Sequence, residues 1–542
     1  MQSSKPCRTC APFCAFRSEF GASMTKYVCA VDVGTRSARA ALFDAQGVMQ
    51  PREVEPFAIH VSGDDIGEYR SADIWAAVCR VVRRARDVAG VRAEDVAGLA
   101  FDATCSLVLL DGQGAGVAIG DGGRDTIAWF DRRAQVEARQ ASHVGGLVID
   151  RLGGAMSPEM QVPKLMWVRD HRPAAWAKLG SSLDLTDWLT SRSIGRVVQS
   201  HACLATKWPY HRDAGGWQRA FLDGVGMGDL IERVSLPDRG AAVGEGLGPL
   251  TAEAAAALGL TTGTLVGAGL IDGYAGALGC EALAGRDGCG RATAMVIGTS
   301  AGLIDTREAQ PEPRGLWGPF REVIRDETWC VEGGLTHAGA LLDRVLSHWP
   351  TIGVGGIGHD TVLGEVEARV SQRGYAFADD LHVLPDPSGM RGTPISSDPG
   401  GSIHGLRPDG SLAALAALYW RTAVALALSV EQVLDRFSES GLGSDTLVMS
   451  GGLSASPVLT QLFADATGRD ILLPVRSDCI LLGTAIAASV ASGLHGDLTE
   501  AGRRMAPAAR RVAPNPDARC ALARDRAVFR QLQENRELLA RL

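Results

Sequence analysis

The sequence predicts an α/β fold, because apolar strand-like runs alternate with helical patterns along most of its 542 residues. A pair of similar glycine hairpins further indicates that the chain contains a duplicated domain. The first hairpin, VCAVDVGTRSARAALFD, covers residues 28–44, and the second, AMVIGTSAGLIDT, covers residues 294–306. Each runs an apolar strand into Gly-Thr and returns as a second apolar strand that carries Asp near its end. One such hairpin is a weak signal, but two copies indicate a repeated domain.

The first half of the chain is predicted to alternate strands and helices in the following order. Short apolar runs favour strands at residues 28–33, 38–43, 96–101, 107–110 and 265–270. Helical patterns lie at residues 71–88, 163–168 and 186–193. The first of these helices has Trp75, Val78, Val82 and Ala85 on one face, which is typical of a helix packed against a sheet.

The second half repeats this alternation around the second hairpin. Strands are predicted at residues 446–450 and 471–474, and helices at 274–278, 336–348, 412–438, 457–466 and 482–492. Residues 503–516 are rich in Pro and Arg and are expected to form a loop. The last stretch, 524–542, predicts an amphipathic helix whose stripe of Phe529, Leu532, Leu539 and Leu542 docks on the second domain.

These patterns divide the chain into four parts. Residues 1–25 carry few signals of order and are expected to be a disordered leader, since Met24 stands directly before the first strand. The N-terminal domain is expected at 26–275 and the C-terminal domain at 276–500. A linker and the C-terminal helix occupy residues 501–542.

Composition and charge exclude several classes of protein. The net charge of −8 and the lack of any Lys/Arg-rich block argue against a nucleic-acid surface. No membrane partner is expected, because the richest apolar stretch, 412–430, is interrupted by Arg421 and is better explained as a buried helix. Most of the twelve cysteines stand singly in apolar segments, which favours a reduced, cytoplasmic enzyme. Cys7, Cys10 and Cys14 have metal-ligand spacing but no fourth ligand nearby.

The first glycine turn is a candidate phosphate and metal site. Asp32 stands at the end of a buried strand, where a carboxylate can hold a hydrated Mg²⁺. Gly34 lets backbone N–H groups approach an anion, and Thr35 and Arg36 are placed to reach phosphate oxygens. The alternative is an ordinary hairpin in which Asp satisfies its own turn. The second hairpin, with Gly298, Thr299 and Ser300, favours the phosphate interpretation.

Asp272 is the candidate general base. It follows the strand predicted at residues 265–270, and the carboxyl ends of core strands are where open α/β sheets bind ligands. An acidic group there can accept the proton of an attacking hydroxyl during phosphoryl transfer. The alternative role is the N-cap of the helix that follows. Gly451 and Gly452, between a strand and a helix, are a weaker signal for a nucleotide ring lying against backbone.

Polar residues in apolar surroundings are candidates for a polyol site, which needs several fixed hydrogen-bonding groups and an aromatic face. The candidates are Asp102, Thr104, Cys105, Trp129, Asp131, Arg133, Lys164 and Glu332. Taken singly, Asp131 and Arg133 are better explained as a structural ion pair and Lys164 as a solvated helix residue. As a set, their meaning depends on whether they converge in space.

A series of motifs along residues 27–495 resembles the FGGY carbohydrate kinases. In chain order they are DVGT (32–35), FDATCSLVLLD (101–111), WFDRRA (129–134), MSPEMQVPKLMWV (156–168), LIDGYAGALG (270–279), GTS (298–300), GLWGPF (315–320), EGG (332–334) and SGGLSASP (450–457). Agreement across this many separate motifs is far more specific than any one of them. Within the family, FDATCSL, residues 156–168 and CLATKWPY (203–210) are most similar to ribulokinases, especially the D-ribulokinase type.

The resemblance implies two actin-like (ribonuclease H-like) domains flanking a catalytic cleft, with the sugar site in the N-terminal domain and the nucleotide site in the C-terminal domain. It implies ATP and Mg²⁺ as cofactors, with Asp32 and Asp272 as metal-side carboxylates and Asp272 as the base. Residues 34–36 and 298–300 would form the two phosphate loops, and residues 451–452 would line the adenosine site. By the same resemblance, the sugar is contacted by Cys105, Trp129, Lys164, Asp272 and Glu332.

The function expected on these grounds is phosphorylation of a ketopentose at its terminal hydroxyl, with D-ribulose favoured. Alternatives are an L-ribulokinase or other polyol kinase, a degenerate kinase that senses sugar, or an actin-like ATPase coupled to a protein partner. A small sugar is thus the expected partner, and a homodimer stays open. The chain departs from the family pattern at three places. SGMRGTP at 388–394 and Asp478 in place of Glu bear on domain contacts or nucleotide affinity, and Leu335-Thr336-His337 bears on the substrate.

Overall fold

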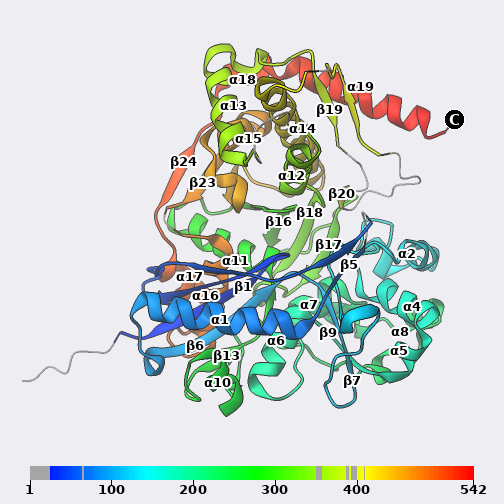
Figure 1. The fold of residues 1–542 in the computed structure, drawn as a ribbon, viewed down its shortest axis with the longest axis vertical. Coiled ribbons are helices and arrows are strands. Elements are labelled where there is room, and N and C mark those ends of the chain that lie inside the picture. The colour runs from blue at the N-terminus through cyan, green and yellow to red at the C-terminus, as the bar shows by residue number, and fades with distance from the viewer. Residues whose placement is uncertain are drawn as a thin grey trace, which may run out of the picture.

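Two large mixed sheets, one in each lobe, organise the chain in the computed structural model (Figure 1). The structure describes residues 25–63, 66–349, 357–385, 390–391, 400–407, 409–475 and 477–541. The expected leader lies outside these residues except for Thr25, as do Cys7, Cys10, Cys14 and Leu542. Most of the departure at 388–394 also lies outside them.

The first sheet is built around the predicted N-terminal hairpin. Its strand order is β12-β13-β6-β1-β2-β3, and β14 also pairs with β6. β1 pairs antiparallel with β2 and parallel with β6, so β1 and β6 end at the same edge. The strands are β1 (Tyr27–Val33), β2 (Ser37–Asp44), β3 (Glu53–Pro56), β6 (Val96–Ala103), β12 (Gly246–Pro249), β13 (Leu265–Gly267) and β14 (Leu270–Ile271).

The second sheet repeats the pairing pattern of the first. Its order is β17-β18-β16-β15-β22-β23-β24, with β20 beside β18. β15 pairs antiparallel with β16 and parallel with β22, as β1 does with β2 and β6. The duplication predicted from the two hairpins is confirmed. The strands are β15 (Thr293–Ile297), β16 (Ala301–Arg307), β17 (Trp317–Arg321), β18 (Trp329–Leu335), β20 (Met390–Arg391), β22 (Thr446–Ser450), β23 (Asp470–Pro474) and β24 (Ala509–Val512).

A smaller sheet and a group of short helices enlarge the first lobe. The sheet order is β4-β5-β8-β7-β9, and its strands are β4 (His60–Ser62), β5 (Ile66–Tyr69), β7 (Leu107–Asp111), β8 (Thr126–Ile127) and β9 (Leu179–Asp184). The helices are α2 (Gln135–Ser142), α3 (Leu147–Asp150), α4 (Gln161–His171), α5 (Pro173–Lys178), α7 (His201–Lys207), α8 (Arg219–Gly224) and α9 (Leu230–Arg233), with the hairpin β10 (Tyr210–His211) and β11 (Gly216–Trp217) between α7 and α8.

Amphipathic and apolar helices cover the two large sheets. α1 (Ser71–Ala89) packs on β2 and β3 through the predicted face, with Trp75, Val78, Val82 and Ala85 buried. α6 (Leu185–Ile194) and α10 (Ala252–Leu258) pack in the same lobe. The second lobe holds α12 (Gly339–His348), α13 (His359–Arg373), α14 (Leu412–Glu439), α15 (Pro457–Thr467), α18 (Pro516–Ala521), α19 (Ala523–Leu539) and the hairpin β19 (His382–Leu384) with β21 (Ser402–His404).

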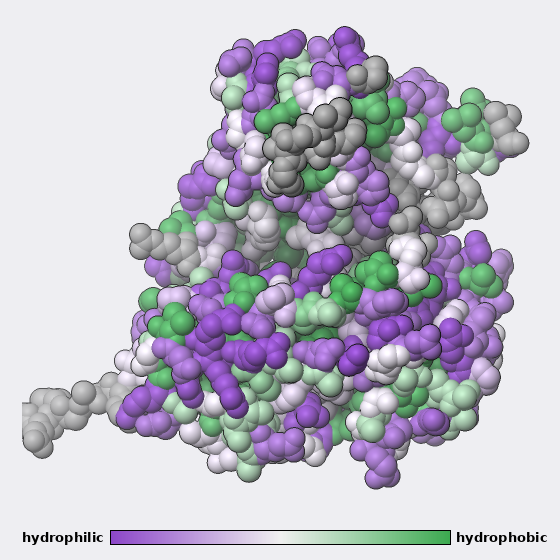
Figure 2. Space-filling view, viewed as in Figure 1, coloured by the Kyte–Doolittle hydropathy of each residue, from purple (hydrophilic) through white to green (hydrophobic). Residues whose placement is uncertain are grey.

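α14 is the one helix among the described residues that is long and apolar enough to cross a membrane. It packs against α12, α13, α15 and β18, and 83% of its most apolar window is buried inside the protein. Burial on this scale is typical of a core helix, as the sequence predicts. On the face shown in Figure 2, polar side chains cover most of both lobes and apolar ones gather only in small groups.

Helices α11 (Asp272–Arg286) and α16 (Cys479–Ala491) pack against each other where the lobes meet (Figure 1). α11 packs on β15 and β22 of the second sheet, whereas α16 packs on β1, β6 and β13 of the first. α17 (Leu498–Met505) contacts both helices. A Cβ at Gly279 would overlap the carbonyl oxygen of Cys479, and one at Gly483 would overlap that of Ala275. The two backbones are therefore in direct contact.

The structure corrects several boundaries expected from the sequence. The strand expected at 265–270 is interrupted after Gly267, and a Cβ at Gly269 would overlap the Thr186 hydroxyl. The loop expected at 503–516 is wrong, because it contains β24, which pairs antiparallel with β23. The helix expected at 274–278 begins at Asp272 and continues to Arg286.

The C-terminal helix α19 docks on the second lobe, as its apolar stripe predicts. Phe529 and Leu532 are buried in the core that α14 and β23 also line. A buried ion pair between Arg421 of α14 and Asp525 of α19 fixes the contact. Leu539 was expected in the same contact, but it is exposed because the helix continues beyond the surface it packs on.

We predict that Gly279→Ala destabilises the protein. The added methyl group must push the α11 and α16 backbones apart, and overpacking of this kind costs about 1–3 kcal/mol. Thermal unfolding followed by circular dichroism measures the effect as a lower melting temperature. Gly285→Ala is the matched control on the same helix, since no atom lies within 4 Å of its added Cβ. Equal melting temperatures for the two variants would contradict the contact.

Candidate active site

A cavity of about 1000 Å³ is lined by both lobes and gathers most of the residues that the sequence singles out. Its lining includes residues from the two glycine turns, from the strand ends of the first lobe, and from the start of α11. The predicted residues found there are Asp32, Gly34, Thr35, Thr104, Cys105, Trp129, Asp272, Gly298, Thr299, Ser300, Glu332, Gly451 and Gly452. Convergence of residues so far apart in the chain identifies this cavity as the candidate active site.

Five predicted residues do not line the cavity, namely Arg36, Asp102, Asp131, Arg133 and Lys164. Asp131 and Arg133 form the structural ion pair that the sequence favoured, with 2.7 Å between Oδ2 and Nη2. Arg36 is exposed at the tip of the β1–β2 turn. Lys164 of α4 is fully buried, and its ammonium donates hydrogen bonds to the carbonyl oxygens of Ala128 and Trp129 at 3.1 and 3.3 Å. Burial lowers the pKa of Lys164. The structure therefore places Lys164 behind the wall that carries Trp129, where it supports the backbone.

Other lining residues were not singled out by sequence reasoning. Arg39 of β2 lines the cavity and pairs with Asp32, with 2.6 Å between Nη1 and Oδ2. Lys207, at the end of α7, lies with its ammonium 5.0 Å from the centre of the Trp317 ring. Arg52 and Arg510 also line the cavity. Lys207 belongs to the CLATKWPY motif, so that motif was the one available signal for it.

The first glycine turn is held in place from the small sheet of the first lobe. The Trp129 indole donates a hydrogen bond to the Thr35 hydroxyl at 3.0 Å. The Tyr69 hydroxyl donates to the Thr35 carbonyl oxygen at 2.9 Å. These bonds link the turn that carries Gly34 to the aromatic residue expected beside a sugar, so both are fixed in one unit.

The second glycine turn is held by the strand–glycine–helix segment that follows β22. Gly451 has φ +103, and a Cβ there would overlap the Ile297 carbonyl oxygen directly before the turn. Only glycine fits this position. On the other side, Ala338 donates its backbone N–H to the Thr299 carbonyl oxygen at 2.9 Å. Exposed Gly298 and Thr299 thus project into the cavity on a fixed backbone.

Three aspartates gather where neighbouring parallel strands of the first sheet end. Asp32 of β1 lies in register with Asp102 of β6, and Asp272 directly follows β14, which also pairs with β6. Asp102 is fully buried and accepts a hydrogen bond from the Thr484 hydroxyl of α16. Burial, and next the charge of Asp32, raise the pKa of Asp102 well above its usual range.

Asp32 fits a hydrated divalent cation. Its Oδ2 accepts from Arg39, whereas its Oδ1 is buried and has no hydrogen-bond donor. Burying a carboxylate oxygen without a hydrogen-bond donor costs free energy of folding unless a cation or a water molecule binds to that oxygen. Mg²⁺ prefers oxygen ligands and keeps several waters, so it does not need a cage of protein ligands. Asp272, the second expected metal-side carboxylate, lines the same cavity.

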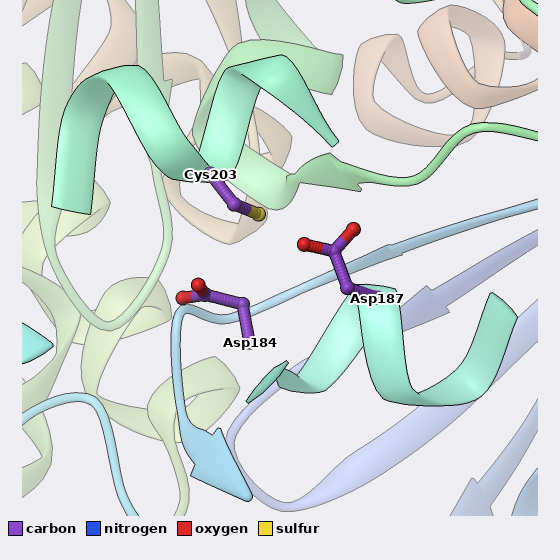
Figure 3. A group of neighbouring side chains, drawn as sticks. All are labelled: Asp184, Asp187 and Cys203. Atoms are coloured by element: carbon purple, nitrogen blue, oxygen red, sulfur yellow. The ribbon is translucent and has the colours of Figure 1, made fainter. Parts of the chain in front are cut away.

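Direct metal-ligand geometry occurs elsewhere among the described residues, at Asp184, Asp187 and Cys203 (Figure 3). Their ligand atoms lie within 4.8 Å of one another. However, Asp184 accepts from the Gln161 amide at 2.6 Å and from the Trp208 indole at 2.8 Å. Burial raises the pKa of Asp187 and of the Cys203 thiol well above their usual ranges. The Ser200 backbone N–H also donates to Asp187 at 2.9 Å, so these side chains form a hydrogen-bonded core cluster.

Asp272 occupies the first turn of α11, with Ile271 at the N-cap position. The alternative role for Asp272 as an N-cap side chain is not observed, because no side-chain cap bond forms at this helix start. Its carboxylate accepts the backbone N–H of Gly273 at 2.7 Å. The first turn of a helix carries partial positive charge, which suits a carboxylate at this position.

Two departures from the expected pattern have structural roles. Thr336 donates a hydrogen bond to Glu159 at 3.3 Å and so joins the end of β18 to the segment before α4. Asp478 caps α16 through the Ile480 N–H and pairs with Arg52 of the first lobe at 3.1 Å. Burial raises the pKa of Asp478. Both residues lie at contacts between the lobes.

Comparison with known proteins agrees with the geometry. The N-terminal-domain profile of the FGGY family of carbohydrate kinases matches residues 27–279, and the C-terminal-domain profile matches residues 293–492. An FGGY carbohydrate kinase domain-containing protein of Danio rerio is 33% identical over 556 residues, covering 94% of this chain and 98% of that protein. A D-ribulokinase of Saccharomyces cerevisiae is 29% identical over 514 residues, covering 86% of this chain and 72% of that protein.

Solved structures share the fold over nearly the whole length. The gluconate kinase from Lactobacillus acidophilus superposes with a TM-score of 0.75 at 19% sequence identity, covering 95% of this chain and 98% of that one. The paired actin-like domains expected from the sequence are thus confirmed. The chain belongs to the FGGY family of carbohydrate kinases and is a sugar phosphotransferase.

Proposed function

We propose that this protein transfers the γ-phosphoryl group of ATP to the terminal hydroxyl of a ketopentose, with D-ribulose as the preferred substrate and D-ribulose 5-phosphate as the product. The observation that carries the proposal is that both glycine turns and Asp272 line one cavity. Backbone N–H groups at two turns suit a phosphate chain held from both sides. A carboxylate in the same cavity suits an acceptor hydroxyl.

The pentulose is supported by the segments that line the sugar side. Cys105 lies in FDATCSL, one of the motifs most similar to D-ribulokinases, and Lys207 lies in another such motif. The relative named D-ribulokinase matches over most of this chain. Three polar or aromatic groups of the first lobe, Cys105, Trp129 and Lys207, line the cavity together with Glu332 of the second lobe. These groups offer donors, an acceptor and a flat surface to a polyol.

In the proposed reaction, Asp272 orients the 5-hydroxyl and accepts its proton. The hydroxyl oxygen forms a bond to the γ-phosphorus as the bond from that phosphorus to the bridging oxygen of ADP breaks. The turns at Gly34 and Gly298 would hold the phosphate oxygens while charge shifts among them. Arg39 adds a cation beside Asp32 at this end of the cavity.

Mg²⁺ would be held on the side of Asp32, whose Oδ1 is buried without a donor, with Asp272 nearby in the lining. When bound, the ion neutralises charge on the β- and γ-phosphates of the nucleotide. Gly451 and Gly452 would lie against adenosine, since these two glycines also line the cavity.

The alternatives differ in what stimulates turnover. An L-ribulokinase or a polyol kinase would use the same machinery on another sugar. An actin-like ATPase would hydrolyse ATP without sugar and respond to a protein partner. The residues around Trp129 and Lys207, which add a polar wall to the cavity, favour the sugar kinase.

A panel of pentuloses and pentitols with coupled detection of ADP tests the proposal. We expect ATP turnover to depend on sugar and kcat/KM to be highest for D-ribulose. Highest activity on L-ribulose would move the protein to the alternative kinase, and turnover independent of every sugar would contradict the proposal.

Asp272→Asn is predicted to lower kcat by about a hundredfold or more, because the amide cannot accept the hydroxyl proton. The fold and sugar binding should persist, measured as the rise in melting temperature on adding sugar. Asp73→Asn is the matched control, since Asp73 also stands in the first turn of a helix but is exposed. A near-normal kcat in Asp272→Asn would remove Asp272 from the role of base.

Substitutions of Lys207 and Lys164 are predicted to have different effects, the first on sugar binding and the second on stability. Lys207→Met should raise KM for sugar about tenfold with little change in KM for ATP, because Lys207 lines the cavity. Lys164→Met should mainly lower the melting temperature, because two buried carbonyl oxygens lose their donor. The reverse pattern would restore Lys164 as the sugar contact and exclude Lys207.

A further inference from the structure

We propose that Tyr274 is a positioning residue that fixes the direction of the Glu332 carboxylate and thereby sets which sugar hydroxyls the cavity accepts. The inference rests on the proposed function, in which Glu332 contacts the sugar. It adds a specificity-determining residue outside the set that the sequence identifies.

The contact is short and shielded from water. The Tyr274 hydroxyl donates to Glu332 Oε2 at 2.6 Å. Tyr274 is 1% exposed and Glu332 3% exposed, and both line the cavity. A hydrogen bond from a neutral hydroxyl to a buried carboxylate is charge-assisted, so it is stronger than a bond between two neutral groups. The phenol therefore holds one oxygen of the carboxylate in a defined place.

The bond joins two elements that carry different parts of the reaction. Tyr274 stands two residues after Asp272 in the first turns of α11, whereas Glu332 lies on β18 of the second sheet. Glu332 is in register with Trp317 on β17, and the Trp317 ring lies beside the Lys207 ammonium. Tyr274 thus ties the helix of the general base to the strand that carries the sugar-side carboxylate.

A fixed carboxylate discriminates between sugars in a way that a mobile one does not. Its second oxygen points in one direction, so it suits a hydroxyl of one configuration on the sugar carbon it faces. Glutamate has three rotatable side-chain bonds, and ordering them at the moment of binding costs free energy. When the Tyr274 phenol orders the Glu332 side chain in advance, the free energy of sugar binding no longer includes that cost.

Tyr274→Phe tests the inference, because it removes the hydroxyl and keeps the ring. The sugar used is the one in the panel that the wild type phosphorylates fastest, together with its epimer at one hydroxyl. We expect KM for the preferred sugar to rise about tenfold and KM for ATP to change less than twofold. The ratio of kcat/KM for the preferred sugar over its epimer should fall about fivefold or more.

Tyr419→Phe is the matched control. Tyr419 is also a buried tyrosine, and its hydroxyl bonds to His359 at 2.9 Å in the second lobe, away from the cavity lining. It should lose stability without a change in sugar KM or in the epimer ratio. An effect of equal size in both variants would assign Tyr274 a purely structural role and overturn the inference.

A double-mutant cycle with Glu332→Gln separates action through Glu332 from any other effect. If Tyr274 acts by holding Glu332, the Phe substitution should raise sugar KM far less in the Gln background than in the wild type. Additive effects would overturn the inference while leaving the proposed function intact. A wild type that phosphorylates no sugar in the panel would overturn both, so the two failures are distinguishable.

Discussion

Helices α11 and α16 cross between the two large sheets with their backbones in contact, and this contact holds the two lobes together beside the cavity. Each helix packs on the sheet of the other half of the chain, α11 on the second and α16 on the first. Gly279 and Gly483 permit the contact, because a side chain at either would overlap a backbone carbonyl. Asp272 begins α11 and Asp478 caps α16, so the crossing also fixes a carboxylate from each half at the cavity. The actin-like pairing of the two lobes therefore positions site residues as well as stabilising the fold.

Acidic side chains at and beside the cavity are held by specific hydrogen-bond or ion-pair partners. Asp32 pairs with Arg39, Asp478 with Arg52, and Glu332 with the Tyr274 hydroxyl. Asp102 is held by Thr484 of α16, and burial favours its protonated form. Oδ1 of Asp102 and Oδ1 of Asp32 are both buried without a donor, and of these two residues Asp32 lines the cavity. A cation at Asp32 Oδ1 would complete the pattern, which is why the site suits a nucleotide that carries Mg²⁺.

Local sequence patterns predicted the hairpins, the core helices, and the glycine turns and Asp272 of the cavity lining, because strand ends and glycine turns are encoded by adjacent residues. What the sequence could not provide depends on contacts between distant segments. Residues 503–516 read as a loop, yet β24 forms there because β23 offers an open edge. Lys164 and Lys207 are both lysines in apolar helices, and only the fold distinguishes the one behind Trp129 from the one beside Trp317. Arg39 was missed for a similar reason, since its alternation along β2 looks like that of a solvent-facing residue until Asp32 is placed opposite.

We infer that the crossing helices bring a sugar hydroxyl and the terminal phosphate of ATP together beside Asp272. A crystal structure of the protein with D-ribulose and a non-hydrolysable ATP analogue tests this most directly. We expect the 5-hydroxyl of the sugar to lie within about 3 Å of the Asp272 carboxylate and in line with the γ-phosphorus. We also expect phosphate oxygens to lie against both glycine turns. A sugar bound with its terminal hydroxyl facing away from Asp272, or a triphosphate held outside the two turns, would contradict it.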